Sequence, residues 1–479
     1  TGPPRRTGFL LPKWHIHGRL LPDGALTGER LMKVSRNAGS VSILRKARGL
    51  AGGTNLMRNS KRKANAFRLV LVGVGASCSF ATTALAGGFD IHEQSTVFLG
   101  SASAGVAAGG SIGSMFWNPA ATGQFSGFNT ESSYTLILPN ADVSVTSFAG
   151  QSTAGAPSSF TNAGDITIPA VTGASYGTYQ VSKDLFLGMA INSPFGLATK
   201  PDNVDYLGSY LGVTSKLITI NANPTIAYRI APGVTIGAGI QIEWAQTKLQ
   251  FRTSSTSIAQ FLGEGWAVGA TAGIMLEPVA GTTIGLGYRS QMTHDLDGNL
   301  SGLGPSHDAT STLDLPDIVT LSLRQEMTPT TRLLGTVEWT NWSRFQNVAV
   351  SAPGIPALNV AANWNDGWFF SLGGEYDYSP LLTLRSGVAY ELSPIDDASK
   401  RLVQVPDNNR VWLNIGASYK CEFCRSLLNS EQTTLDFGYS HVFIQDGAFD
   451  LETPTGIPVT GLVRNAEFDL LSMGVRTKW

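Results

Sequence analysis

Charged side chains are scarce in this sequence, and acidic ones are rarest near its start. Asp, Glu, Lys and Arg make up 14% of the 479 residues, whereas soluble proteins contain roughly 25%. Residues 1 to 68 hold 15 of the 34 Lys and Arg but only two of the 35 Asp and Glu, so residues 69 to 479 carry 19 basic and 33 acidic side chains. The low total suits a protein with one face in lipid, and the acidic excess argues against a nucleic-acid partner.

Long hydrophobic runs are also missing. No segment after residue 86 has the run of about eighteen apolar residues that a transmembrane helix requires. Apolar and polar residues alternate instead, as in residues 217 to 230, which gives a strand one apolar and one polar face. The alternation predicts fourteen strands, at residues 128 to 138, 168 to 181, 184 to 192, 216 to 230, 233 to 250, 265 to 277, 281 to 300, 310 to 326, 330 to 350, 363 to 378, 381 to 392, 408 to 420, 432 to 448 and 464 to 479.

The connections between these strands alternate in length. Short turns such as Ser182-Lys183 are interleaved with long polar loops such as residues 139 to 167, which is the arrangement of an outer-membrane barrel. Trp479 ends the last predicted strand, and a terminal aromatic is a typical signal for the barrel assembly machinery. A soluble β-sandwich also buries alternate residues, but it needs neither feature.

The predicted fold is therefore all-β, a transmembrane antiparallel β-barrel of about fourteen strands over residues 128 to 479. Its expected location is the outer membrane of a Gram-negative bacterium. The expected partners are outer-membrane lipid and lipopolysaccharide, with the barrel assembly machinery during biogenesis.

Residues 57 to 86 have the pattern of a signal peptide. Basic residues follow Met57, an apolar stretch runs from Leu69 to Phe80, and Ala84-Leu85-Ala86 forms an A-x-A cleavage site. Because the apolar stretch is short and contains Gly and Ser, a transmembrane helix is disfavoured. Residues 1 to 56 are predicted to be an upstream extension outside the working protein, and a mitochondrial-type targeting arm is the alternative.

Residues 87 to 127 lack the periodicity of a strand or a helix. The stretch from Gly87 to Phe125 is rich in Gly, Ala and Ser. A segment of mostly small residues cannot form a core of its own and has to pack inside something larger. We therefore predict that residues 87 to 127 form an N-terminal hatch inside the barrel.

Cysteine is rare, with three in the whole chain. Cys421 and Cys424 form a C-x-x-C pair, but no second pair and no nearby histidine completes a zinc site. A short-loop disulfide or two idle thiols remain as interpretations. His441 is the only histidine in the later strands and no serine can be assigned to it, so we expect no enzymatic activity, no cofactor and no metal.

Several short motifs follow one another along the chain. They are GGFDIHEQS from Gly87, NPA from Asn118, NSPFGLAT from Asn192, NPTIAYR from Asn223, LPD from Leu315, EWTNWS from Glu338, VPD from Val405 and DFGY from Asp436. In this order and spacing they resemble the FadL/TodX-type outer-membrane transporters of long-chain fatty acids and hydrocarbons. The resemblance covers nearly all of residues 87 to 479.

The resemblance implies that a hydrophobic substrate leaves the barrel sideways, where the third strand kinks inward. The kink position is occupied by Asn192, Ser193, Pro194, Phe195 and Gly196. Pro194 lacks a donor for the ladder and Gly196 permits irregular dihedral angles, although an ordinary loop entry fits the same residues. The resemblance also implies that a hatch gate contacts the kink from inside, formed by Asn118, Pro119 and Ala120.

The substrate pocket is expected to be apolar, with one cation if a carboxylate is recognised. Candidates for its lining are Phe195, Leu197 and Phe251, and candidates for the cation are Lys248 and Arg252. Such cations are more often solvated charges on the loop side of a strand, and a neutral hydrocarbon requires neither. The leading hypothesis is passive uptake of long-chain fatty acids or related hydrophobic compounds. The alternatives are a phospholipase-like barrel enzyme and a general porin.

Overall fold

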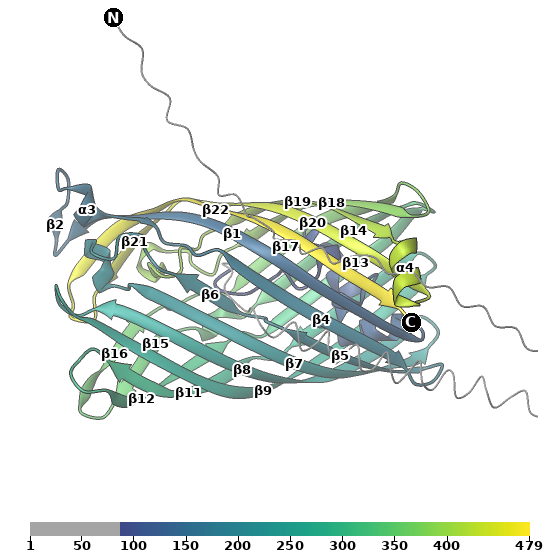
Figure 1. The fold of residues 1–479 in the computed structure, drawn as a ribbon, viewed down its shortest axis with the longest axis horizontal. Coiled ribbons are helices and arrows are strands. Elements are labelled where there is room, and N and C mark those ends of the chain that lie inside the picture. Colours follow the sequence, from purple (N-terminus) through teal and green to yellow (C-terminus); the bar gives the residue numbers. More distant parts are fainter. Residues whose placement is uncertain (1–86) are drawn as a thin grey trace, which may run out of the picture. The chain divides into compact units, whose positions relative to one another are not determined.

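The computed structural model describes residues 87 to 479, which form a closed antiparallel β-barrel (Figure 1). The predicted extension and signal peptide lie outside the described residues. The strands are β1 Phe128–Phe148, β2 Gln151–Ser152, β3 Asn162–Asp165, β4 Ala170–Gln180, β5 Leu185–Asn192, β6 Gly196–Thr199, β7 Thr214–Ala231, β8 Val234–Arg252, β9 Ile258–Val279, β10 Thr282–Arg289, β11 Met292–Ser301, β12 His307–Leu315, β13 Ile318–Thr328, β14 Thr331–Thr340, β15 Asn347–Ala352, β16 Ile355–Ala361, β17 Gly367–Asp377, β18 Leu382–Leu392, β19 Arg410–Lys420, β20 Gln432–Ile444, β21 Gly447–Glu452 and β22 Pro458–Lys478.

The helical elements are short. They are α2 Thr96–Leu99, η1 Val106–Ala108, η2 Ile112–Phe116, η3 Pro119–Gln124, α3 Ser158–Thr161, η4 Leu207–Tyr210, η5 Trp342–Arg344, η6 Ala398–Lys400 and α4 Glu422–Leu428. Within the described part of the chain, none of them has the length and apolar character that a membrane-crossing helix needs. Cys421 and Cys424 form a disulfide at the start of α4, so the first of the two interpretations of this pair is confirmed.

The barrel closes where β1 pairs with β22, from Asn129 opposite Lys478 to Phe148 opposite Val459. The predicted fourteen-stranded antiparallel barrel is confirmed. Four predicted strands are interrupted, because β10 and β11, β12 and β13, β14 and β15, and β20 and β21 are separate segments. At the second interruption Pro316 cannot donate to a ladder.

The prediction of a polar loop over residues 139 to 167 is wrong in its first part. β1 continues to Phe148, and its residues from Asn140 to Phe148 pair with β22. Val143 and Val145 face inward there and are buried. The long strand therefore projects beyond the run that sequence alternation alone had marked.

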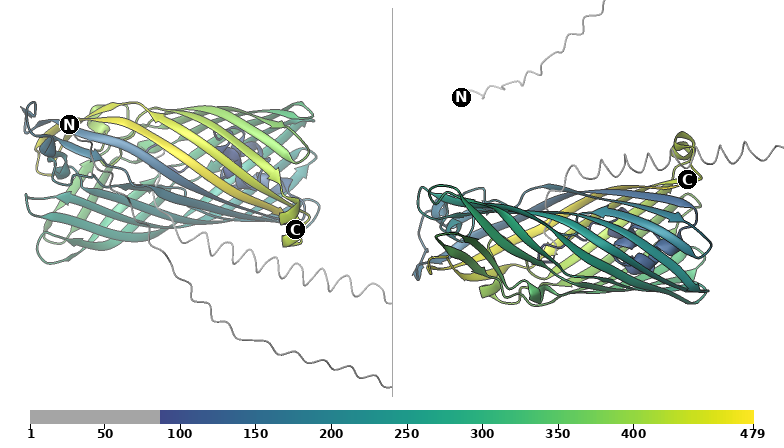
Figure 2. Two further views of the ribbon diagram at one scale, coloured as in Figure 1. Left: turned by 45° about the horizontal axis from the view of Figure 1, so that its top comes forward. Right: turned by 90° about the horizontal axis from the view of Figure 1, so that it is seen from below.

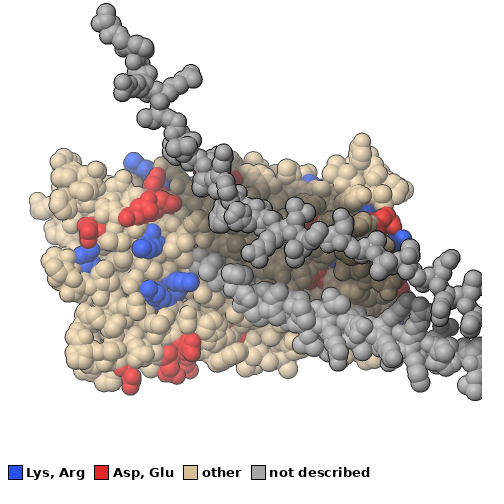
Figure 3. All heavy atoms as spheres, viewed as in Figure 1, with Lys and Arg blue, Asp and Glu red and all other residues tan. Residues whose placement is uncertain are grey.

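The outer face of the barrel is apolar and its inner face is polar. On β19, Leu413 and Ile415 are exposed to 46% and 60%, whereas Asn414 and Ser418 between and beyond them are buried. On the face shown in Figure 3, charged side chains gather toward the two ends of the barrel where no grey atoms cover it. This distribution fits a band of lipid between two aqueous rims.

Residues 87 to 127, here called the internal segment, lie within the barrel. Their short helices are seen through the strands in the half that carries the C-terminus (Figure 2), and nearly all their side chains are buried. Wall strands approach them very closely. A Cβ added to Gly237 of β8 would overlap the backbone of Ala120, and one added to Gly387 of β18 would overlap the carbonyl of Ser101. Small residues on both sides therefore let the segment fill the lumen.

Candidate lateral opening and lumen cavity

The third spanning strand is interrupted at the predicted kink. β5 ends at Asn192 opposite Asn221, and β6 resumes at Gly196 opposite Ile218. One extra residue is therefore accommodated on the broken strand, as in a β-bulge. The hydroxyl of Thr219 accepts from the N–H of Phe195 at 3.0 Å and donates to its carbonyl at 2.7 Å. A side chain of β7 thus replaces the ladder bonds that the break removes.

The other edge of the broken strand has lost its partner. β4 pairs with β5 only as far as Ser175 opposite Ile191, and the next pairing on this side is the bridge between Thr167 and Thr199. Between these points, residues 170 to 174 of β4 pair only with β1 among the described strands. The wall therefore has a break in its hydrogen bonding between β4 and β6, which we call the lateral break.

The first residues of the internal segment occupy the inner side of the lateral break. The N–H of Ile91 donates to the carbonyl of Pro194 at 2.8 Å, and the N–H of Gly196 donates to the carbonyl of Phe89 at 2.9 Å. Asp90 and Phe195 form an antiparallel bridge between these bonds. Residues 89 to 91 of the internal segment thus pair, like a short strand, with the edge of the kink that β4 leaves unpaired.

Gln94 connects the two sides of the lateral break. Its side-chain amide donates to the carbonyls of Ser193 at 2.9 Å and of Ile91 at 2.7 Å. Its own carbonyl accepts from the hydroxyl of Tyr176 on β4 at 2.9 Å. One residue therefore joins the kink, β4 and the internal segment.

The three residues of the predicted hatch gate, Asn118, Pro119 and Ala120, lie at the start of η3. Asn118 caps η3 by accepting from the N–H of Ala120 at 2.9 Å. Its amide donates to the carbonyls of Ala107 at 2.8 Å and of Ile274 on β9 at 3.1 Å. The hydrogen bonds from the internal segment to the kink come from the backbone of Phe89 and Ile91 and from the side chain of Gln94, and the contact of the gate residues with the kink stays a prediction. A gating role for the three residues stays a prediction.

An apolar cavity of about 110 Å³ lies in the lumen beside β6. Leu197 and Phe251, two of the candidates for the substrate pocket, line it, whereas Phe195 does not belong to the lining and has its ring 6.4 Å from that of Phe89. The full lining consists of Phe89, Leu197, Leu211, Ser215, Lys216, Leu217, Thr247, Leu249, Gln250, Phe251, Leu296, Ser311, Thr312, Leu313, Phe345, Val348, Val350, Leu358, Val360, Leu402, Gln404, Val405 and Pro454.

The two predicted cations do not line this cavity. Arg252 is buried and bound to Asp205, Ser209 and the carbonyls of Val204 and Ser255, so its guanidinium fixes the chain before β7. Lys248 is half-buried and lies opposite Lys216 on β7. Lys216 is the one charged residue in the lining. Sequence reasoning missed it because strand alternation places it on the outward parity of β7.

A buried cluster of charged side chains lies beside the start of the internal segment. His92 lies 3.9 Å from carboxylate oxygens of Asp90 and Glu391 and 3.7 Å from one of Glu338. Burial opposes the charged imidazolium, but these carboxylates, Asp90 foremost, raise the pKa of His92 to about 10. Burial raises the pKa of Asp90 to about 7. Asp90, His92 and Glu338 place one ligand atom each within 4.8 Å of one another, so they are able to hold a metal ion.

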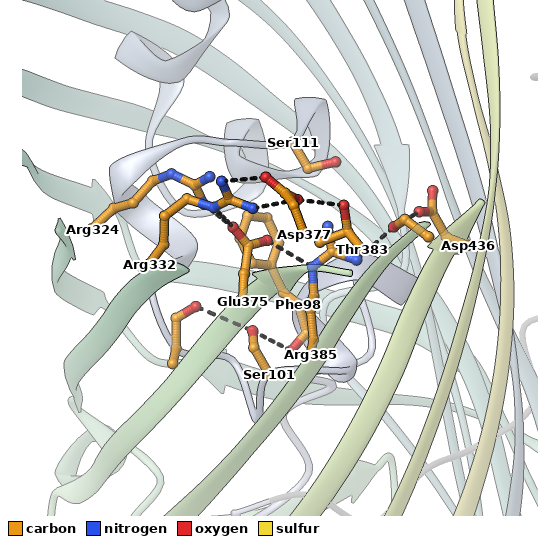
Figure 4. A network of polar contacts seen from close by, with 12 residues as sticks. Phe98, Ser101, Ser111, Arg324, Arg332, Glu375, Asp377, Thr383, Arg385 and Asp436 are labelled. Atoms are coloured by element: carbon orange, nitrogen blue, oxygen red, sulfur yellow. Dashed lines mark hydrogen bonds and ion pairs between the residues drawn. The ribbon is translucent and has the colours of Figure 1, made fainter. Parts of the chain in front are cut away.

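A second polar network covers the inner face of the wall on strands β13 to β22 (Figure 4). Glu375 contacts Arg324, Arg332 and Arg385, each at 2.7 or 2.8 Å. Arg332 also contacts Asp377 at 2.7 Å. The network links β13, β14, β17 and β18 through side chains on their inner faces.

The barrel has an apolar outer face, a lumen filled by its own N-terminal segment and a break in one wall. This architecture is typical of a membrane-spanning transport protein. A family model described as outer membrane protein transport protein (OMPP1/FadL/TodX) matches residues 77 to 476. The chain belongs to this family, and it is an outer-membrane protein.

Individual relatives agree with this assignment. The chain is 26% identical over 430 residues to the long-chain fatty acid transport protein of Escherichia coli (strain K12), covering 78% of this chain and 92% of that protein. It is 27% identical over 407 residues to outer membrane protein P1 of Haemophilus influenzae, covering 74% and 86%. The proteins named by function are transporters, which agrees with the prediction that this chain is not an enzyme.

Solved structures share the fold. A FadL homologue from Pseudomonas aeruginosa superimposes with a TM-score of 0.74 at 18% identity, covering 82% of this chain and 99% of the other. The toluene transporter TodX of P. putida gives a TM-score of 0.60 at 14% identity, covering 81% and 99%.

Proposed function

We propose that this protein takes up long-chain fatty acids or related hydrophobic compounds by passive diffusion, from the lumen cavity through the lateral break into the membrane. The observation that carries the proposal is that Leu197 belongs both to the cavity lining and to β6, the edge of the break. An apolar molecule in the cavity is therefore one strand away from the lipid phase. A sideways exit spares it the passage through water that an axial channel would impose.

The internal segment supports this proposal as a hatch. It fills the lumen toward the C-terminal end of the barrel, and its residues 89 to 94 are hydrogen-bonded to the break. These bonds are few and lie at an unpaired edge, so they can open locally while the rest of the ladder stays intact. Release of residues 89 to 94 would open the break without unfolding the barrel.

Lys216 favours a substrate whose head group is a carboxylate. It is the one charged residue in an otherwise apolar and uncharged polar lining, and a buried or half-buried ammonium is stabilised by an anionic partner. Relatives named as fatty acid transporters are consistent with such a cargo. A neutral hydrocarbon would gain nothing from this side chain.

The test is uptake of a radiolabelled long-chain fatty acid by cells that lack their own transporter. Cells that express the chain from Met57 are expected to accumulate the label, and cells with an empty vector are not. A Leu197→Asp variant places an unpaired charge in the cavity and should abolish uptake, while Leu413→Ala on the lipid-facing side of β19 serves as a control. Equal uptake by wild type and empty vector, with folded barrel at the surface, would refute the proposal.

A further inference from the structure

The connection between β19 and β20 contains a helix, whereas the other connections on the same rim are short turns. β7 ends at Ala231 and β8 begins at Val234, but β19 ends at Lys420 and β20 begins only at Gln432. α4 occupies most of that interval. A two-residue turn is enough to reverse the chain between neighbouring strands, so closing the barrel does not require α4.

α4 carries an apolar face without a partner. Phe423 and Leu427 are exposed to 76% and 73%, and they are the two most exposed large hydrophobic side chains among the described residues. Because they are four positions apart, they lie on one face of the helix. Glu422 and Arg425 point away from this face and form an exposed ion pair at 3.0 Å. The helix is therefore amphipathic despite its short length.

The disulfide holds this helix in place. Cys421 caps α4, and its Sγ accepts from the N–H of Cys424 at 3.0 Å while the two residues are also joined covalently. The N–H of Cys421 donates to the carbonyl of Thr433 on β20 at 2.8 Å. A helix of seven residues is unstable in water by itself. The cross-link restrains the turn that carries Phe423, so this side chain keeps a fixed direction.

α4 lies beside the barrel wall at its C-terminal rim. The right-hand view of Figure 2 shows it, as the yellow-green helix next to the C-terminus, standing off the side of the barrel and not beyond its end. Tyr419, the last outward-facing residue of β19, is 44% exposed, and Tyr376 and Tyr378 at the preceding turn of this rim are 49% and 66% exposed. Exposed tyrosines at a barrel rim mark the level of the lipid head groups. α4 is therefore continuous with the lipid-facing surface at that level.

The position and size of the apolar face decide what covers it. A stable interface between proteins buries about 800 Å² on each partner, which two side chains on a seven-residue helix do not provide. A soluble protein in the periplasm would meet the end of the barrel, whereas α4 stands at its side. Lipid is the phase that already covers the neighbouring wall, where Phe437 of β20 is 43% exposed.

We propose that α4 is a disulfide-braced anchor in the leaflet of the outer membrane that faces the periplasm. Phe423 and Leu427 insert among the lipid chains just below the head groups, and Glu422 and Arg425 stay at the aqueous surface. Amphipathic helices at such an interface bury their apolar face about 5 to 10 Å deep. The anchor fixes the depth at which this rim of the barrel sits in the membrane.

The test measures the surroundings of position 423 by fluorine NMR. The full protein, with its disulfide intact, carries 4-fluorophenylalanine at Phe423 alone and is placed in nanodiscs of phosphatidylethanolamine and phosphatidylglycerol. One sample contains a lipid with a nitroxide close to its head group, and another contains a water-soluble gadolinium chelate. The nitroxide lipid should broaden the fluorine signal several-fold, and the chelate should broaden it little.

Two other phenylalanines give matched controls. The same label at Phe437, on the lipid-facing side of β20, should respond like the label at Phe423. Phe160 is 53% exposed on α3, which lies at the opposite end of the barrel (Figure 1). A label at Phe160 should show the reverse response, with strong broadening by the chelate and little by the nitroxide lipid.

A substitution on the same helix makes the result specific to its apolar face. Leu427→Asp places a charge on this face, so the label at Phe423 should move into water and become several-fold more sensitive to the chelate. Arg425→Gln on the opposite face should leave both responses unchanged. These variants leave the strands of the barrel intact.

Three results would overturn the proposal. A label at Phe423 that responds like the label at Phe160 in otherwise unchanged protein would show that α4 lies in water. Protection from both reagents would show that protein, such as a second copy of the chain, covers the face. Equal responses in Leu427→Asp and Arg425→Gln would show that the apolar face does not hold the helix in the leaflet.

Discussion

The wall formed by β17, β18 and β19 and the wall formed by β4, β5 and β6 differ in what holds their strands together. β17 and β18 pair without interruption from Trp368 opposite Leu392 to Asp377 opposite Thr383, and the Glu375 network joins their inner faces. β4 and β6 share no ladder, and the nearest bridge joins Thr199 of β6 to Thr167, which precedes β4. The second wall is completed by hydrogen bonds from the internal segment.

The comparison shows how one barrel can be both stable and open. A continuous ladder with crossed ion pairs between the inner faces holds these strands together. The broken wall relies on bonds to a separate segment, which can be exchanged without breaking the barrel. If the proposed lateral exit is right, stability and transport depend on different walls of the same barrel.

The largest effect is expected from restoring the broken strand. In Pro194→Val with Gly196→Val, the new N–H and the extended preference of valine favour pairing with β4. Fatty acid uptake should fall to the level of cells without the protein, while the barrel still folds. Pro224→Val is the matched control, because Pro224 lies in β7 opposite Met189 within a continuous ladder. Wild-type uptake by the double variant would mean that the break is not the exit.

In the wall formed by β17, β18 and β19, removal of the Glu375 side chain should destabilise the barrel. Glu375→Ala leaves Arg324, Arg332 and Arg385 facing one another in the lumen, and loss of one partner of a buried pair costs about 3 to 5 kcal/mol. The thermal midpoint in detergent should fall clearly. The control is Glu431→Ala. Glu431 is 62% exposed and pairs with Lys478, so its removal should shift the thermal midpoint little. An unchanged midpoint in Glu375→Ala would show that the network does not hold this wall.

A smaller effect is expected from Gln94, which joins both sides of the lateral break. Gln94→Ala removes the hydrogen bonds to Ser193 and Ile91, worth about 1 to 3 kcal/mol where a buried carbonyl is left unpaired. Hydrogen–deuterium exchange should quicken at residues 89 to 94 and remain unchanged in β18. Gln124→Ala, which removes a bond to Gly110 at the far end of the segment, is the control. Identical exchange in the two variants would contradict the role given to Gln94.

The smallest effect is expected from Lys216, the cation proposed to bind the carboxylate head group of the substrate. Lys216→Gln should reduce uptake of a fatty acid a few-fold, since a single half-exposed ion pair is worth about 1 kcal/mol or less. Uptake of an alkane of equal length should not change. Lys248→Gln, opposite on β8 and outside the cavity lining, should leave both unchanged. A loss that is equal for acid and alkane would remove Lys216 from recognition of the carboxylate.

Sequence patterns predicted the existence of the spanning strands better than their interruptions and ends. Alternation located all fourteen spanning strands because one face meets lipid, and Pro194 with Gly196 marked the broken one. The same alternation missed the interruptions at Pro316 and near η5, since the residues on either side keep the pattern. It also ended β1 too early, because Val143 and Val145 are apolar on the inward-facing parity, whereas Leu136 and Leu138 are apolar on the outward-facing one.

The candidate site was harder to predict because it is formed by segments far apart in the chain. Nothing in the local sequence of Asn118 shows that its amide is used by Ala107 and Ile274. The bonds of Phe89 and Ile91 to the kink depend on how the internal segment turns within the lumen. Arg252 resembled a free cation because its partner Asp205 lies in a loop before the preceding strand.

The most direct test of the central claim is photochemical. A long-chain fatty acid with a photoreactive group at its methyl end is allowed to bind, the sample is irradiated, and labelled peptides are identified by mass spectrometry. If the substrate leaves through the wall, the labels should lie at residues 170 to 174 and 193 to 199, on the two edges of the lateral break. Labels confined to the short turns around Gly233 and Glu277 would show that the substrate leaves along the barrel axis and would contradict the account.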